Sequence, residues 1–150
     1  MAGLLIIAHA PLASALREVA EHVYPGCAGV VQAIDVLPQT SPEELQARAA
    51  ALLEADAGRD TLILTDVFGA TPCNVAQRVA DGVRVRVVTG VNVPMLWRTL
   101  CYADEPLDSL VARALAGAAQ GVLQATPTRP QQQARSAGEA DAKGHRQDQQ

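Results

Sequence analysis

Aromatic residues are scarce in this chain: Phe, Trp and Tyr together make up 3% of its 150 residues. A hydrophobic core must therefore come mainly from aliphatic residues, which supply most of the 49% hydrophobic content. Such a core suits helices packed against a sheet, and the length fits a single domain. We therefore expect one α/β domain, which the composition places over residues 1–125.

Clusters of Lys and Arg are also missing, and the net charge at pH 7 is −4, so no nucleic-acid partner is expected. Cys27, Cys73 and Cys101 form no C-x-x-C pair, which excludes a zinc knuckle and a disulfide framework and favours reduced thiols. The apolar run that ends at Ala8 is too short for a signal peptide or a membrane span. These absences predict a cytoplasmic protein without direct membrane insertion.

Strand and helix patterns alternate along residues 1–125. Apolar or β-branched runs predict strands at residues 4–8, 28–36, 62–64 and 83–88, and helical periodicity predicts helices at 12–23, 42–53, 72–80, from Pro94 onward and at 107–118. This order predicts a three-layer, doubly wound, mainly parallel sheet of about four strands with helices on both faces. Val122 to Ala125 fit a short C-terminal edge strand, and the Gln-rich residues 126–150 are expected to form a disordered polar tail.

Two of the predicted strands end beside residues that can carry chemistry. His9 closes the first strand, and Asp66 follows the apolar run at residues 62–64. Carboxyl ends of parallel strands meet at one edge of a sheet, so we expect the two side chains to converge. After Gly69, Thr71 is expected to cap a helix that begins at Pro72, with free backbone N–H groups opening toward the same place. The sequence thus predicts an anion site beside a histidine and a carboxylate.

A histidine in such a site can act as a nucleophile toward phosphorus. A hydrogen bond from one ring nitrogen to Asp66 would fix the tautomer and leave the lone pair of the other nitrogen exposed. Gly69 allows close backbone approach, while the Thr71 hydroxyl and the helix N-terminus can hold phosphoryl oxygens. This chemistry requires no metal and no cofactor.

Simpler interpretations exist for each of these residues. His9 can be a hydrogen-bonded histidine without chemistry, and Asp66 can cap a turn. Cys73 and Arg78 have the Cys-x4-Arg order of a cysteine phosphatase, but no glycine-rich cradle lies between them. The combination of His9 with the Asp66 turn favours the phosphoryl site.

Three segments, His9, the turn from Asp66 to Asn74 and the loop from Gly90 to Leu96, together resemble the enzyme IIA domain of the mannose family of the bacterial phosphotransferase system. The resemblance spans residues 1 to about 125 and implies that His9 takes a phosphoryl group from the phosphocarrier protein HPr and passes it to a IIB-type acceptor. It further implies that Asp66 orients the ring and that Gly69, Ala70 and Thr71 bind the phosphoryl group. The resemblance also implies a homodimer in which two chains exchange the short last strand, a position that Val122 to Ala125 fit.

Two other functions stay open at this stage. Sugar-transporting members of the family often continue into a IIB domain where this chain has a polar tail, which motivates a regulatory sensor whose phosphorylation state changes its binding to a partner protein. The phosphotransfer subunit of a dihydroxyacetone kinase shares the fold and the histidine. The segments from Thr71 to Asn74 and from Val93 to Met95 resemble the mannose family more closely.

Overall fold

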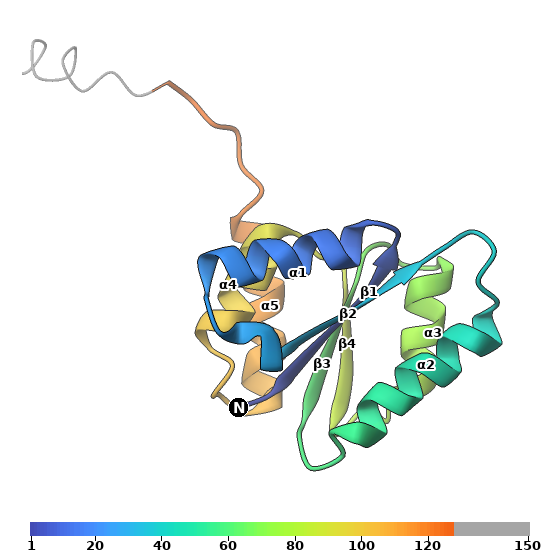
Figure 1. Ribbon diagram of the computed structural model, residues 1–150. Helices are drawn as coiled ribbons and strands as arrows, with labels where there is room; N and C mark the ends of the chain where they lie inside the picture. Colours follow the sequence, from blue (N-terminus) through green and yellow to red (C-terminus); the bar gives the residue numbers. More distant parts are fainter. Residues whose placement is uncertain (128–150) are drawn as a thin grey trace, which may run out of the picture.

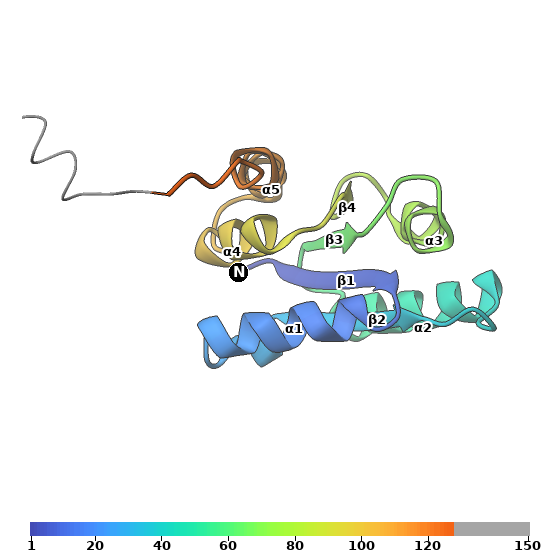
Figure 2. The same ribbon diagram turned by 90° about the horizontal axis from the view of Figure 1, so that it is seen from above.

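A four-stranded parallel sheet forms the centre of the computed structural model, which describes residues 1–127 (Figure 1). The strands lie in the order β2-β1-β3-β4 and all neighbours pair in parallel, as Figure 2 shows from above. Their bounds are β1 (Gly3–His9), β2 (Val31–Val36), β3 (Thr61–Thr65) and β4 (Val85–Thr89). The two central strands are apolar along almost their whole length because helices cover both of their faces.

Helices cover the two faces of the sheet in unequal numbers (Figure 1). On one face lie α1 (Leu12–Val23), α4 (Val93–Cys101) and α5 (Leu107–Gln120), which pack against Leu4, Ile6, Leu62 and Leu64. On the other face lie α2 (Pro42–Ala55) and α3 (Thr71–Val79), which pack against Leu5, Ile7, Ile34 and Ile63. This arrangement confirms the predicted three-layer α/β fold with helices on both faces.

Side-chain caps mark the starts of two helices: α2 begins at the expected residue 42, and α4 begins at Val93, one residue before the expected Pro94. The Glu44 N–H donates to Ser41 Oγ over 3.1 Å, and Pro42 is the first residue of α2. At α4 the Met95 N–H donates to Asn92 Oδ1 over 2.9 Å. Each cap fixes where a helix leaves the carboxyl edge of the sheet.

The second strand starts later than predicted. Cys27–Gly29 form a short 3₁₀ helix, so that β2 begins at Val31 rather than at residue 28. Gly26 adopts a φ of 93° immediately before this turn, a conformation that glycine enters without steric strain. The run of β-branched residues therefore carries strand structure only after the chain has turned.

The predicted edge strand at Val122 to Ala125 is absent from the described part of this chain. After α5, residues 122–127 pair with no strand, and the side chains of Val122 and Leu123 are 75% and 73% exposed. The outer strands β2 and β4 each keep an open edge, but within residues 1–127 this segment pairs with neither of them. The rest of the predicted tail, 128–150, lies outside the described residues. Within residues 1–127, no helix combines the length and hydropathy needed to cross a membrane.

Candidate functional site

His9 lies at the carboxyl edge of the sheet, as the last residue of the central strand β1. The six preceding residues of this strand are buried, whereas the His9 side chain is 54% exposed. Its backbone position is fixed from the β2 side, where His9 is in register with Val36 and the Ala10 N–H donates to the Val36 carbonyl over 3.0 Å. A rigid strand thus presents an accessible imidazole ring.

Asp66 holds His9 from the other side, directly after β3. Its Oδ2 accepts a hydrogen bond from the His9 backbone N–H (2.8 Å) and lies 2.6 Å from His9 Nδ1. Its Oδ1 accepts from the Val67 N–H over 2.8 Å. Because a carboxylate only accepts, the network assigns the ring proton to Nδ1 and leaves the lone pair on Nε2. The predicted convergence of His9 and Asp66 is present in the structure.

The Asp66 carboxylate is stabilised in its charged form. Partial burial by itself raises the pKa of Asp66, but hydrogen bonds from the His9 N–H, the His9 ring and the Val67 N–H together outweigh it. The pKa therefore falls below the ordinary value for aspartate. At neutral pH Asp66 is ionised and can keep the His9 ring in one orientation.

The turn that follows Asp66 leads into the first turn of α3. Gly69 has a φ of 86°, which requires glycine or a strained side chain, and Asn74 Nδ2 donates to the Gly69 carbonyl over 3.3 Å. The predicted N-cap, Thr71, is instead the first helical residue. Ala70 takes the cap position with extended backbone angles, and its carbonyl accepts the first helical bond from the Asn74 N–H (3.0 Å).

The N-terminus of α3 differs from those of the other helices that begin at this edge. In α1 the Ser14 N–H donates to Asp35 Oδ1 over 3.0 Å, and α2 and α4 carry the Ser41 and Asn92 caps. Among residues 1–127, no side chain accepts a cap hydrogen bond at α3. Its first-turn amides and its positive dipole end are thus available to an anion.

His9 and Thr71 line a common cavity of about 330 Å³, together with Ala10, Val36, Leu37, Pro38 and Thr40. Hollows of about 520 and 620 Å³ lie against other parts of the chain, but no histidine lines either of them. We therefore choose the smaller cavity as the candidate site because of the residues that line it and not because of its volume. It joins an exposed ring nitrogen to the uncapped start of α3.

The sequence did not single out Asp35 or the contact of Asn74 with the Gly69 carbonyl. Asp35 caps α1 from a neighbouring strand, and no local sequence signal announces such a contact. The cysteine-phosphatase interpretation is not supported, because Cys73 is 1% exposed and closed to substrate. The site consists of one imidazole, one carboxylate, the Thr71 hydroxyl and backbone amides.

Comparisons with known proteins agree with this geometry. Residues 3–115 match the family described as PTS system fructose IIA component, EIIA-man. The chain is 38% identical over 100 residues to the PTS system mannose-specific EIIAB component of Escherichia coli (strain K12), a match that covers 63% of this chain and 31% of that protein. It is 32% identical over 102 residues to the PTS system sorbose-specific EIIA component of Lacticaseibacillus casei, covering 67% of this chain and 73% of the relative.

Solved structures share the fold. The mannose/sorbose specific IIA subunit of the phosphotransferase system from Enterococcus faecalis superposes with a TM-score of 0.77 at 23% identity, covering 85% of this chain and 97% of that one. The PTS IIA protein associated with the fucose utilization operon of Streptococcus pneumoniae superposes with a TM-score of 0.68 at 25% identity, covering 83% and 96%. The chain thus shares its overall α/β fold with these two proteins.

Proposed function

The chain belongs to the mannose family of phosphotransferase-system IIA components, and from this premise we propose that His9 is a phosphoryl carrier. In this proposal His9 accepts a phosphoryl group from phospho-HPr and passes it to a IIB-type acceptor. The observation that carries the proposal is the double contact of Asp66 Oδ2 with the His9 N–H and Nδ1. This contact leaves Nε2 as the one ring nitrogen with a free lone pair.

The transfer step is an attack of His9 Nε2 on the phosphorus of the donor's phosphohistidine. A new bond forms between Nε2 and phosphorus, and the nitrogen–phosphorus bond of the donor breaks with its electron pair going to the donor ring. His9 keeps its Nδ1 proton, so the positive charge that develops on its ring faces Asp66 directly. Transfer to the acceptor is the same step in reverse, with His9 as the leaving group.

The start of α3 supports the binding of the transferred group. A phosphoryl group on Nε2 carries two negative charges and extends into the cavity that His9 and Thr71 share. We assign its oxygens to the Thr71 hydroxyl and to the backbone N–H groups at the uncapped helix start, where Gly69 and Ala70 shape the approach. No metal or other cofactor takes part in this scheme.

A homodimer formed by strand exchange is part of the same proposal. Val122 and Leu123 are exposed and pair with no strand within residues 1–127, and a sheet edge of a second copy would give them a partner. Light scattering or sedimentation of the full chain, compared with a Val122→Asp, Leu123→Asp double variant, tests this part. A dimer that persists unchanged in the double variant would count against strand exchange at this segment.

The experiment that tests the proposal is the intact mass of the protein after incubation with phosphoenolpyruvate, enzyme I and HPr. Wild-type protein should gain one acid-labile phosphoryl group, whereas His9→Ala should gain none while keeping the same circular dichroism spectrum. Equal labelling of the two proteins would place the phosphoryl group elsewhere. Adding a IIB protein should then remove the label from the wild type.

A further inference from the structure

Most of the few aromatic side chains in this protein line one hollow, away from the proposed phosphoryl site. The sequence contains one Trp, two Tyr and one Phe, and the Trp and both Tyr lie at this hollow of about 430 Å³. It is formed around α4, which packs against both α1 and α5 in the same helical layer (Figure 2). We call it the aromatic hollow; its lining includes Tyr24, Trp97, Arg98, Tyr102, Gly117 and Gly121. Aromatic walls around a space of this size are typical of small-molecule sites.

Internal contacts hold two walls of the aromatic hollow in place. The Tyr24 hydroxyl forms a hydrogen bond with Cys101 Sγ over 2.6 Å. The Arg113 guanidinium lies 3.9 Å from the centroid of the Tyr102 ring, and it donates to both carboxylate oxygens of Glu105. Because these side chains are already ordered, a ligand that packs against them loses little affinity to the ordering of the site.

Arg98 brings a positive charge to the hollow. Its side-chain stem is held by the close approach of α5, since a Cβ atom at Gly117 would lie 2.7 Å from Arg98 Cβ. The guanidinium donates to Gln120 Oε1 over 3.3 Å, which is a neutral partner. Within residues 1–127 Arg98 forms no ion pair, unlike Arg84 and Arg113. No Asp or Glu of the described residues lines the hollow, so the charge that it presents is positive.

We propose that the aromatic hollow is a binding site for a small planar aromatic carboxylate. The flat ring packs against the aromatic walls, where the Trp97 side chain is 41% exposed, and the carboxylate meets the Arg98 guanidinium. An uncharged ring leaves that guanidinium without a counter-charge, and a cationic ring is repelled by it. Neither His9 nor Thr71 lines this hollow, so the inference goes beyond the proposed function and does not depend on it.

Trp97 supplies the measurement, because it is the only tryptophan in the sequence and its indole N–H gives a single NMR signal. Titration of the ¹⁵N-labelled full chain with 2-naphthoate should shift this signal saturably. The uncharged 2-naphthamide should bind about threefold to tenfold more weakly. Decahydro-2-naphthoate keeps the charge without the flat aromatic ring and should also bind more weakly than 2-naphthoate. A Trp97 signal that 2-naphthoate does not shift would overturn the proposal.

Two arginine substitutions separate a specific contact from a general effect of charge. Arg48 lies on α2, on the other face of the sheet, and like Arg98 it forms no ion pair within the described residues. Arg98→Gln should abolish the preference for 2-naphthoate over 2-naphthamide, whereas Arg48→Gln should leave this preference unchanged. Equal effects of the two substitutions would contradict the assignment of the carboxylate to Arg98.

Trp97→Leu tests the aromatic wall, with binding followed by saturation-transfer NMR of the probe itself. The affinity for 2-naphthoate should fall about threefold to tenfold, and an unchanged affinity would overturn the packing of the ring against Trp97. Labelling of His9 by phospho-HPr should be the same in Trp97→Leu, Arg98→Gln and wild type, because neither side chain lines the His9 cavity. Equal labelling also shows that the variants fold. Failure of the wild type to accept a phosphoryl group would refute the proposed function alone.

Discussion

The two edges of the sheet carry loops of opposite character. At the amino edge, the loops before β3, before β4 and before α5 contain several charged side chains: Asp56, Arg59, Asp60, Asp81, Arg84, Asp104 and Glu105. At the carboxyl edge, the loops that surround the proposed site hold His9 and Asp66 as their ionisable side chains. The edge with many charges is therefore not the edge with the proposed chemistry.

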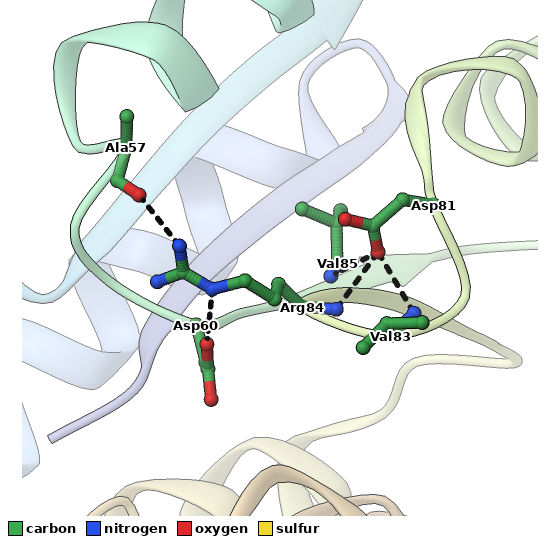
Figure 3. Close-up of polar contacts among 6 residues, drawn as sticks. All are labelled: Ala57, Asp60, Asp81, Val83, Arg84 and Val85. Carbon is green, nitrogen blue, oxygen red and sulfur yellow. Dashed lines mark hydrogen bonds and ion pairs between the residues drawn. The ribbon is translucent and has the colours of Figure 1, made fainter.

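Figure 3 shows how the charges of the amino edge are used. Asp81 Oδ1 accepts hydrogen bonds from the backbone N–H groups of residues 83–85 at 2.8 to 2.9 Å. The Arg84 side chain donates to Asp60 Oδ1 over 2.9 Å and to the Ala57 carbonyl over 3.1 Å, which ties the two loops together. These groups hold the backbone, and the bonds that they form are internal.

Hydrogen bonds lower the pKa of a carboxylate at each edge, Asp81 at the amino edge and Asp66 at the carboxyl edge, but the two carboxylates have different partners. The pKa of Asp81 is lowered by hydrogen bonds from the Val85 and Val83 N–H groups, and the pKa of Asp66 also lies below its ordinary value. Asp81 binds only backbone, whereas Asp66 binds a ring whose second nitrogen remains open. A lowered carboxylate pKa thus occurs at both edges, whereas an open ring nitrogen beside a carboxylate is found at the edge with the proposed site.

The largest expected effect comes from the histidine at the carboxyl edge. His9→Ala should reduce phosphoryl labelling by phospho-HPr to background, because among residues 1–127 no second histidine lines the cavity of the proposed site. His22→Ala removes an exposed histidine of α1 and should label like the wild type. Labelling kinetics measured by intact mass check both variants. A labelled His9→Ala protein would contradict the assignment of the phosphoryl group to His9.

A smaller effect is expected from the carboxylates when each is changed in the same way. Asp66→Asn should slow the labelling of His9 by about 10- to 100-fold, since it removes the charge that orients the ring and stabilises it after transfer. Asp81→Asn should leave the labelling rate unchanged. Quenched-flow labelling with phospho-HPr measures both rates, and equal rates in the two variants would contradict the role given to Asp66.

The lowered pKa of Asp66 should make the stability of the protein depend on pH in the acid range. The pKa of Asp66 is lower in the folded protein, so its stabilising contribution is complete above about pH 5 and is lost as the pH falls through the folded-state pKa, below about pH 4. The melting temperature of wild type should therefore drop toward that of Asp66→Asn in acid. A constant difference between the two proteins from pH 6 to about pH 3 would refute this contribution.

The smallest effect is expected at the ion pair of the amino edge. Arg84 and Asp60 are 50% and 48% exposed, so Arg84→Ala should lower the free energy of unfolding by about 1 kcal/mol or less. Labelling of His9 should not change. Urea unfolding followed by circular dichroism gives the stability, and a labelling defect in this variant would show that the two edges are coupled.

Much of the fold could be predicted because its signals are local. The buried runs of β1 and β3 and the start of α2 at residue 42 depend on neighbouring residues, and the structure confirms them. The convergence of His9 with Asp66 followed from a rule about parallel sheets and is also present.

Other features depend on contacts that the sequence does not announce. Thr71 has the hydroxyl of a good cap, but the first helical bond falls on the Ala70 carbonyl, so the helix starts one residue earlier than expected. Asp35 caps α1 from a strand that lies beside β1 only in the folded sheet. The segment from Val122 to Ala125 has residues typical of a strand, but within residues 1–127 it pairs with neither outer strand of the sheet, and the sequence pattern alone does not show this.

The position of the phosphoryl group on the His9 ring tests the central claim most directly. NMR of ¹⁵N-labelled, phosphorylated protein identifies which ring nitrogen is bonded to phosphorus and which carries a proton. Our account predicts phosphorylation at Nε2, with Nδ1 protonated and hydrogen-bonded to Asp66. A phosphoryl group on Nδ1, or on any residue other than His9, would contradict it.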